Sequence, residues 1–334
     1  MKILIVKYGA LGDVVRTSYI LRGIVEKYSN VSITWLTSKV AKDLLRFNHN
    51  IDNILTEDCN FKKVFDEEFD LVLSLDDELE ILKKIEKLNY KNWFGAYLLN
   101  EQVVYSENSS LWFDMGLISK FGKEKADKLK KENVLEHNEI FAKMLDIKVN
   151  NIFYGNIKYE ENFKQKLSTK FYNIGINSGS GGRWESKKLS IEHTIALIYK
   201  LLSKKINDKD VCVYLLGGED EKERNMMINN RFENENRVKY LGEFRILEFA
   251  ALIKNLDYLI SSDSLALHLA IAQKIKNLSF YAPTSAQEIG TFGTGIKIKS
   301  TAEDYCSYKK DADNTTITVE RICNAFYEHL ELED

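Results

Sequence analysis

Short apolar runs alternate with segments of helical periodicity along the first half of the chain. Ile3 to Tyr8 and Ser32 to Thr37 are apolar runs of strand length, whereas Val14 to Tyr28 and Glu78 to Leu88 repeat apolar residues at helical spacing. A further apolar run, Asp70 to Asp76, ends in acids, where strands of a parallel sheet present functional groups. Strands that alternate with helices predict a parallel sheet covered by helices.

The pattern changes near residue 92 and starts again near residue 170. Asn92 to Asn133 is polar, and we predict a surface insertion with few strands that ends in a lysine-rich run. A helix is predicted over Leu135 to Leu145, and the charged segment Tyr159 to Lys170 suits a linker or a bridging helix. We therefore predict a first domain over residues 1–157.

The second half repeats the alternation and predicts a second domain over residues 158–315. The expected strands are Tyr172 to Asn177, Val211 to Leu216, Tyr258 to Ser261 and Leu278 to Tyr281; the expected helices are Ile191 to Leu202, Glu221 to Asn230, Leu247 to Ile253 and Leu265 to Ala272. Residues 316–334 carry a final amphipathic helix that could pack back on the first domain. Two Rossmann-like, doubly wound units in tandem predict an α/β fold with a cleft between the carboxyl edges of the two sheets.

Composition narrows the functional classes. The chain has 334 residues, 44% hydrophobic and 29% charged, with a net charge of -3. No apolar run approaches the roughly 20 residues of a membrane span, so we expect a cytoplasmic protein. The charge balance gives no electrostatic reason to expect a nucleic-acid partner.

Neither a metal nor a disulfide framework is expected. Cys59, Cys212, Cys306 and Cys323 lie far apart in the sequence, without metal-ligand spacing. The pair Asp311 and Asp313 resembles a metal-binding DxD motif, but it lies in a polar loop with no apolar strand before it. We expect no metal and no cofactor.

A glycine-containing turn follows the first predicted strand. Gly12 allows a ligand to approach the backbone, and Asp13 is placed at the N-cap of the next helix. An N-cap aspartate stabilises a helix by about 1 kcal/mol without any catalytic role. Asp13 also lies at the carboxyl end of a strand, where a general base for a hydroxyl group would be needed. The GxGxxG fingerprint of NAD-binding domains is absent, which disfavours a redox enzyme.

The corresponding loop of the second half has the composition of an anion-binding loop. Small residues that include Ser178 and Ser180 are followed by the cations Arg183 and Lys187. The alternative is a flexible loop with ordinary surface lysines. The loop lacks the Gly-Lys-Ser/Thr of a Walker A motif, so nucleoside triphosphate hydrolysis is not predicted.

Two further strand ends carry polar residues. Glu221 follows a pair of glycines and can accept hydrogen bonds from a ribose diol, or can simply favour the helix N-terminus. Asp263 and Ser264 follow a buried strand and cap a helix whose first turns carry His268, an arrangement that can hold a diphosphate. A lone histidine is more often structural, but His268 lies at the same strand edge as the helix cap and the positive end of the helix dipole, which favours ligand binding.

The order of these motifs resembles glycosyltransferase family 9, the heptosyltransferases of lipopolysaccharide core assembly. The resemblance rests on Lys2 to Ile5, Leu11 to Val15, Asp263 to Ala270 and Tyr281 to Thr284, and it covers nearly the whole chain. It implies the GT-B fold and a metal-independent, inverting transfer of a sugar from a nucleotide donor to a glycan or lipid-linked glycan. The protein would then contact a membrane at most peripherally, at its inner face.

The resemblance also assigns roles to residues. Asp13 matches the catalytic base and Lys187 the lysine that contacts the phosphates. Glu221 matches the ribose-binding acid. The remaining donor-binding candidates are Gly12, Ser178, Ser180, Arg183, Asp263, Ser264 and His268. Independently of the resemblance, an acceptor with phosphates or acidic sugars would call for cations in the first domain, so Arg16, Lys120 and Lys123 are acceptor-binding candidates, together with Asp76 at its strand end.

Departures from the family pattern leave alternatives open. Leu265 stands where the family has glycine, and Leu189-Ser190 stand where it has Trp-Pro. Family members commonly use ADP-heptose, but a GDP- or UDP-sugar on the same scaffold is an alternative, as is a non-catalytic nucleotide-sugar binding protein. The joint presence of Asp13, Lys187 and His268 argues against the non-catalytic alternative.

Overall fold

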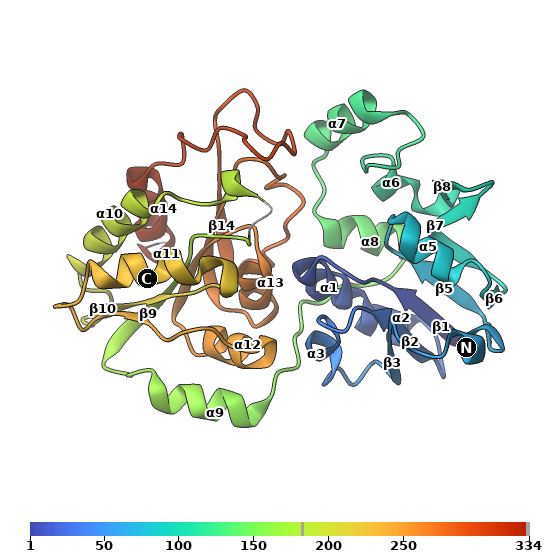
Figure 1. Ribbon diagram of the computed structural model, residues 1–334, viewed down its shortest axis with the longest axis horizontal. Helices are drawn as coiled ribbons and strands as arrows, with labels where there is room; N and C mark the ends of the chain where they lie inside the picture. The colour runs from blue at the N-terminus through green and yellow to red at the C-terminus, as the bar shows by residue number, and fades with distance from the viewer. Residues whose placement is uncertain (182–183, 332–334) are drawn as a thin grey trace. The chain divides into compact units, whose positions relative to one another are not determined.

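The computed structural model describes residues 1–181 and 184–331, and the chain divides into two compact units (Figure 1). The first unit is Met1–Tyr154 and the second is Gly155–Asp334. The division falls just before the boundary predicted after residue 157. Each unit has its own sheet, with helices between most of the consecutive strands, in agreement with the α/β prediction.

The main sheet of the first unit has the strand order β3-β2-β1-β5-β7-β8, and β4 and β6 form a separate pair. The strands are β1 Lys2–Val6, β2 Ser32–Thr37, β3 Asn53–Thr56, β4 Glu68–Phe69, β5 Leu71–Ser74, β6 Asn89–Tyr90, β7 Trp93–Leu99 and β8 Gln102–Tyr105. The helices are α1 Leu11–Thr17, η1 Ser18–Ile20, α2 Leu21–Lys27, α3 Lys42–Leu45, α4 Phe61–Phe65, α5 Leu79–Ile85, η2 Glu107–Ser109, α6 Ser110–Phe113, α7 Lys123–Glu132 and α8 His137–Leu145.

The central strand of this sheet is β1, which pairs in parallel with β2 and β5. Its residues from Ile3 to Val6 are fully buried, because helices cover both faces of a parallel sheet. Leu4, Val6 and Tyr8 lie on the face that packs against α4 and α5. The carboxyl end of β1, which leads into the glycine-containing turn and α1, is therefore fixed by the core.

The segment predicted to be a surface insertion contributes two strands to the main sheet, so the prediction of an insertion is wrong for its first part. β7 pairs in parallel with β5, and β8 returns antiparallel to β7. The turn between them places Asn100 at φ 50° and Glu101 at φ 64°, the left-handed conformation of a two-residue hairpin. A glutamate at the second turn position is atypical, so the hairpin lacks its usual Asn-Gly signal. Gly95 is needed in β7 because a Cβ there would lie 1.9 Å from the Ser74 carbonyl oxygen.

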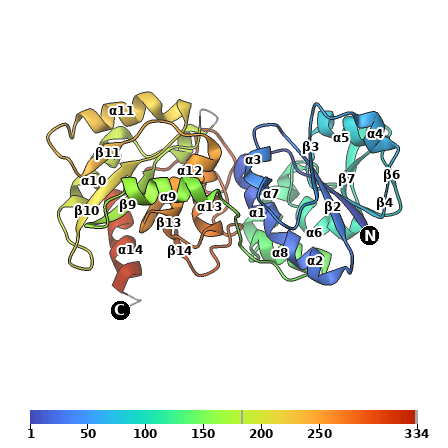
Figure 2. The same ribbon diagram turned by 90° about the horizontal axis from the view of Figure 1, so that it is seen from below.

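The described residues of the second unit form a parallel sheet of order β11-β10-β9-β12-β13-β14 (Figure 2). The strands are β9 Phe171–Asn177, β10 Asp210–Leu215, β11 Val238–Tyr240, β12 Tyr258–Ser262, β13 Lys276–Tyr281 and β14 Gly295–Lys299. The helices are α9 Ile157–Lys166, η3 Glu185–Lys187, α10 Ile191–Leu202, η4 Glu219–Glu221, α11 Lys222–Asn230, α12 Ile246–Lys254, α13 Leu265–Ala272 and α14 Val319–Glu331. The helices α10 and α13 match their predicted bounds, and the edge strands β11 and β14 were not predicted.

The C-terminal helix α14 packs within the second unit. Ile322, Cys323 and Phe326 join the core formed by the sheet and α10. The imidazole Nδ1 of His329 lies 2.6 Å from the hydroxyl oxygen of Tyr258, the first residue of β12. The expectation that this helix packs on the first domain is therefore corrected: its apolar stripe, predicted correctly, is buried against the sheet that precedes it in the chain.

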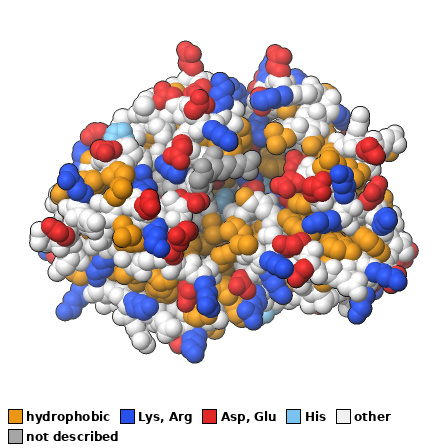
Figure 3. All heavy atoms as spheres, in the orientation of Figure 1, with side chains coloured by type: hydrophobic (Ala, Val, Ile, Leu, Met, Phe, Trp, Pro, Cys, Tyr) orange, Lys and Arg blue, Asp and Glu red, His pale blue; other side chains and the backbone are white. Residues whose placement is uncertain are grey.

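The surface matches the composition. Figure 3 shows basic and acidic side chains interspersed on the visible face, in keeping with the small net charge. Within residues 1–181 and 184–331, no helix has the length and apolar character needed to cross a membrane.

The Tyr258–His329 contact predicts a pH-dependent stability. Burial lowers the pKa of His329, with a smaller contribution from Lys276. The unfolded chain therefore binds a proton more readily, and stability should fall as pH drops below the ordinary histidine value of about 6.5. We expect His329→Gln to have a shallower fall of melting temperature between pH 7.5 and 5.5 than the wild type. His193→Gln, at an exposed position, should keep the wild-type slope; equal slopes in all three proteins would contradict this assignment.

Candidate functional site

The candidate binding residues of the second unit lie at the carboxyl ends of three neighbouring strands. In the sheet, β9 lies between β10 and β12. Ser178 follows β9, Glu221 follows β10, and Asp263 with Ser264 follows β12. The topology therefore brings together residues that the sequence separates by as many as 86 positions (264 minus 178). This edge is where α/β proteins bind ligands.

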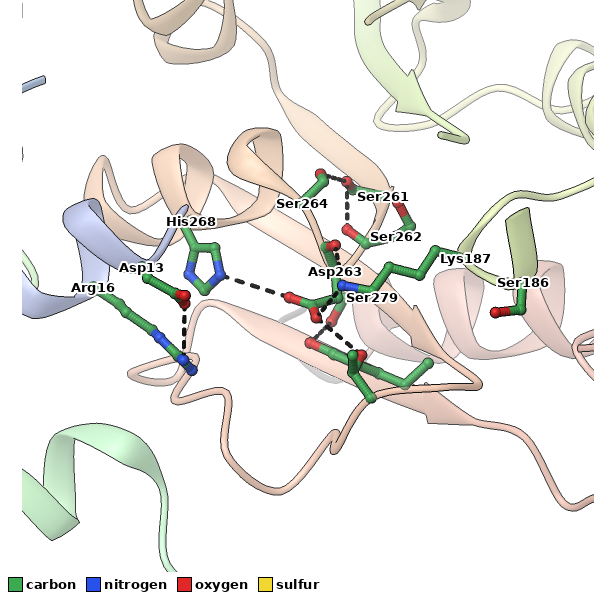
Figure 4. A network of polar contacts seen from close by, with 12 residues as sticks. Asp13, Arg16, Ser186, Lys187, Ser261, Ser262, Asp263, Ser264, His268 and Ser279 are labelled. Carbon is green, nitrogen blue, oxygen red and sulfur yellow. Dashed lines mark hydrogen bonds and ion pairs between the residues drawn. The ribbon is translucent and has the colours of Figure 1, made fainter. Parts of the chain in front are cut away.

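The carboxylate of Asp263 is the centre of a polar network (Figure 4). Lys187 Nζ lies 2.8 Å from Asp263 Oδ2, and Thr284 Oγ1 donates to the same oxygen at 2.9 Å. On the other side, His268 Nε2 lies 3.6 Å from Asp263 Oδ1. The side chains of Lys187 and Asp263 are only 12% and 15% exposed. Side chains from η3, from α13 and from the loop after β13 thus converge on one buried carboxylate.

Electrostatics keep this carboxylate ionised. Burial would raise the pKa of Asp263, but the positive charge of Lys187 and the hydrogen bond from His268 outweigh burial and hold the pKa well below its usual range. The Lys187 amine also donates to the Asp263 carbonyl oxygen at 3.1 Å. An ammonium group has three donors, so Lys187 can direct a third N–H to an anionic ligand while it stays paired with Asp263.

The start of α13 provides backbone donors beside this pair. Ser264 occupies the N-cap position, as predicted, but its hydroxyl lies 2.9 Å from Asn177 Nδ2 and 3.0 Å from Ser261 Oγ and does not bond the helix. The backbone N–H groups of the first turn are therefore not occupied by this side chain. His268 lies in the same helix and is 5% exposed. A helix N-terminus next to a lysine is a site for a phosphate-bearing ligand.

Glu221 links two glycine-containing loops. Its Oε1 accepts a hydrogen bond from Gly181 N at 2.7 Å, and its Oε2 accepts one from Gly218 N at 3.0 Å. A Cβ at Gly179 would lie 2.7 Å from Glu221 Cγ, and one at Gly217 would lie 2.4 Å from Glu221 Cβ. Only glycine at both positions leaves room for this buried side chain. Each carboxylate oxygen has a second lone pair with which it can accept a hydrogen bond from a ligand hydroxyl.

The remaining candidates of this loop have different surroundings. Ser178 is 3% exposed and accepts a hydrogen bond from Arg224 Nε at 3.1 Å. Ser180 Oγ is buried and, among the described residues, has no hydrogen-bond partner. Arg183 lies outside the described residues.

Sequence reasoning missed two residues that hold this site. Arg224 and Asn314 donate hydrogen bonds to the loops that carry Ser178 and Lys187. Arg224 follows Glu221 by three residues, so it lies on the same face of a helix start, and that spacing was an available signal. Asn314 lies in the polar loop dismissed with the DxD-like motif, and nothing local in the sequence indicates its partners.

In the first unit, Asp13 lies in the first turn of α1 but is not its N-cap. The N-cap position belongs to Ala10, and Asp13 is the third helical residue, so the predicted cap is corrected. Asp13 Oδ1 lies 2.8 Å from a guanidinium nitrogen of Arg16, and the Asp13 side chain is 34% exposed. The Arg16 guanidinium in turn lies 5.5 Å from the ring centre of Trp112. Gly12 is buried beside Asp13 in the same turn.

Asp76 holds the turn that precedes α1. Its Oδ1 lies 2.6 Å from Lys7 Nζ, and its Oδ2 accepts the backbone N–H of Tyr8 at 2.5 Å. Burial would lower the pKa of Lys7, but the carboxylates of Asp76 and Asp13 outweigh burial and raise it. Lys7 therefore keeps its positive charge. The structure places Asp76, an acceptor-binding candidate, where it supports the turn from within, since it is only 5% exposed.

The other acceptor candidates lie on the surface of the segment around α7. Lys120 is 46% exposed and pairs with Glu107 at 3.3 Å. Lys123 is 73% exposed and pairs with Asp127 one helical turn away. Both lysines therefore form ion pairs with acids of the same surface segment.

No metal-binding cluster is found in residues 1–181 and 184–331, counting groups of three or more His, Cys, Asp and Glu side chains. In the DxD-like motif, Asp313 Oδ1 accepts hydrogen bonds from the backbone N and the hydroxyl of Thr315, at 2.8 and 2.7 Å. The Asp313 side chain therefore stabilises the turn formed by residues 313–315.

Comparison with known proteins identifies the family of this chain. Residues 105–328 match the model of glycosyltransferase family 9 (heptosyltransferase). A curated relative, lipopolysaccharide heptosyltransferase 1 of Campylobacter coli, is 23% identical over 318 residues, which cover 89% of this chain and 88% of the relative.

Solved structures share the fold over the full length. A glycosyl transferase family 9 protein from Veillonella parvula superposes with a TM-score of 0.74 at 17% identity, covering 100% of this chain and 98% of the other. The E. coli ADP-heptose lps heptosyltransferase II superposes with a TM-score of 0.69 at 16% identity, covering 100% and 99%. These likenesses establish the two-domain GT-B fold that the sequence predicts.

The glycine cradle around Glu221 predicts unequal effects at two adjacent positions. Gly217→Ala places a methyl group 2.4 Å from Glu221 Cβ, whereas Gly218→Ala places one 3.9 Å from Glu221 Oε2, an ordinary contact. We expect Gly217→Ala to lower the free energy of unfolding by about 1–3 kcal/mol and Gly218→Ala by less than about 1 kcal/mol, measured by urea denaturation. Equal costs would mean that the loop tolerates displacement of Glu221.

Proposed function

The chain belongs to glycosyltransferase family 9 and is a glycosyltransferase, and on that premise we propose that it transfers heptose from ADP-heptose to a cell-surface glycan. The names of the Campylobacter coli relative and of the E. coli enzyme support this donor and a lipopolysaccharide-type acceptor. We place the reaction in the cytoplasm, at the inner face of the membrane if the acceptor is lipid-linked.

The observation that carries the proposal is the Lys187–Asp263 pair beside the start of α13. A nucleoside diphosphate leaving group gains negative charge as the bond to the sugar breaks. Lys187 and the N-terminal N–H groups of α13 supply positive charge and donors that meet this change without a metal ion. Glu221 accepts hydrogen bonds from the ribose, and Ser178, Ser180, Ser264 and His268 line the same donor site; Arg183, outside the described residues, stays a candidate from the sequence.

The proposed transfer is a single displacement with inversion. The acceptor hydroxyl oxygen attacks the anomeric carbon, the bond from that carbon to the phosphate oxygen breaks, and ADP departs with the electron pair. The hydroxyl proton passes to the carboxylate of Asp13. Arg16 pairs with this carboxylate at 2.8 Å, and the 34% exposure of the Asp13 side chain lets an acceptor hydroxyl approach it.

The acceptor is bound by the first unit in this proposal. Arg16, Lys120 and Lys123 provide positive charge for phosphates or acidic sugars of the acceptor, while Asp76 supports the turn that carries Asp13. Contact with a membrane is limited to the surface, through a lipid-linked glycan.

A panel of nucleotides tests the donor. We expect ADP and ADP-heptose to raise the melting temperature selectively against GDP, UDP, CDP and dTDP, because a ligand at 100 times its dissociation constant adds about 2.7 kcal/mol of stability. A selective shift with another nucleotide would replace the donor and keep the mechanism. Binding without any transfer to glycan acceptors would favour a non-catalytic nucleotide-sugar binding protein.

Two substitutions test the division of labour. Asp13→Asn keeps the shape of the side chain and should leave the dissociation constant for ADP unchanged while it lowers kcat by about 10²–10⁴-fold. Lys187→Ala should weaken ADP binding and lower kcat together, since a hydrogen bond to a charged group contributes about 1.5–3 kcal/mol. Lys188→Ala removes the neighbouring lysine, which pairs with Glu185, and is the matched control. Isothermal titration calorimetry with ADP measures binding, and the initial rate of ADP release measures kcat. Equal loss of ADP binding in Asp13→Asn and Lys187→Ala would contradict the assignment.

A further inference from the structure

The backbone around Lys187 is held by hydrogen bonds from distant parts of the chain. Lys187 is the last residue of the short helix η3, Glu185–Lys187, in the loop that joins β9 to α10. A lysine has a flexible four-carbon stem, so the position of its amine depends on how firmly its backbone is fixed. A short 3-10 helix provides little rigidity of its own.

Asn314 bonds to both sides of Lys187. Its Nδ2 donates to the carbonyl oxygen of Ser186 at 3.1 Å and to that of Lys188 at 2.8 Å. The same segment adds a backbone bond from Ser186 N to Lys310 O at 3.2 Å. One side-chain amide thus fixes the carbonyl groups of the residue before the lysine and of the residue after it.

Arg224 fixes the continuation of the loop. Its guanidinium nitrogen Nη2 donates to Leu189 O at 2.5 Å and to Thr194 Oγ1 at 2.9 Å, while Nε donates to Ser178 Oγ at 3.1 Å. Leu189 N bonds in turn to Ser178 O at 3.1 Å. The rigid guanidinium therefore ties the loop after β9 to the residues that follow Lys187.

We propose that Asn314 and Arg224 are positioning residues that clamp the backbone on both sides of Lys187 and thereby set the affinity of the site for a nucleoside diphosphate. The link to the diphosphate rests on the proposed function. Neither residue acts on the ligand directly in this proposal. They fix the loop before the ligand arrives, so that binding does not have to order it.

Hydrogen exchange of the ligand-free protein tests the clamp without reference to function. In Asn314→Ala, we expect the amides of residues 185–189 to exchange at least tenfold faster than in the wild type, with exchange of β12 unchanged. Arg224→Lys keeps the charge but places its donors on a single nitrogen, which lacks the spacing with which the guanidinium Nε and Nη2 reach Ser178 and Leu189. It should therefore speed exchange at Leu189. Asn236→Ala, at an exposed amide elsewhere in this unit, is the matched control. Unchanged exchange in both clamp variants would overturn the proposal.

A double-mutant cycle with ADP tests the consequence for binding. We expect Asn314→Ala to weaken ADP binding about tenfold in the wild-type background and by less than twofold in Lys187→Ala, because the clamp acts through Lys187. A tenfold loss in both backgrounds, or in neither, would overturn the proposal. If the wild type binds another nucleoside diphosphate of the panel and not ADP, the donor is wrong and the cycle is run with that nucleotide. If it binds none of the five, the proposed function fails together with the statement about nucleotide affinity, and hydrogen exchange decides whether Asn314 and Arg224 fix the loop.

Discussion

A buried negative charge must be compensated, and the site of the second unit is arranged around that requirement. The carboxylate of Asp263 lies where β12 ends, in surroundings that oppose ionisation, and it is held as an anion by Lys187, Thr284 and His268. Removing one partner from such a pair is costly, because the remaining charge stays buried. The loops that bring these partners together are consequently fixed by contacts within the chain itself.

The first unit also buries a carboxylate, but there burial prevails. It raises the pKa of Asp76 despite the ion pair with Lys7 and the hydrogen bond from a backbone N–H, and these contacts fix the turn from which α1 starts. Asp13 is more exposed and pairs with Arg16, whose guanidinium lies over Trp112. The segment that looked like a surface insertion thus supplies an aromatic ring to the residue that pairs with the proposed base.

The sequence was sufficient where its signal was local and repeated. Alternating apolar runs and helical periodicity located the buried strands and amphipathic helices, including α10 and α13 with their bounds. The hairpin of β7 and β8 was missed because its turn uses Asn100 and Glu101, and the edge strands because they are short and partly exposed. The cluster at Asp263 was predicted because its residues follow strands that meet at one edge. The contacts of Asn314 could not be predicted, since two carbonyl oxygens over 120 residues away leave no pattern in the sequence.

The docking of α14 has a consequence for how the sequence can vary. Tyr258 begins β12 and its hydroxyl lies against His329, whereas Asp263 follows the other end of the same strand. Both contacts belong to one buried strand, so a substitution in the last helix that shifts Tyr258 also disturbs the strand that leads to Asp263. Positions 258 and 329 are therefore expected to covary among relatives, so that a hydrogen-bonding pair is replaced by an apolar pair as a unit. The sequence of the last helix is then constrained by residues at the far end of β12 that it does not contact.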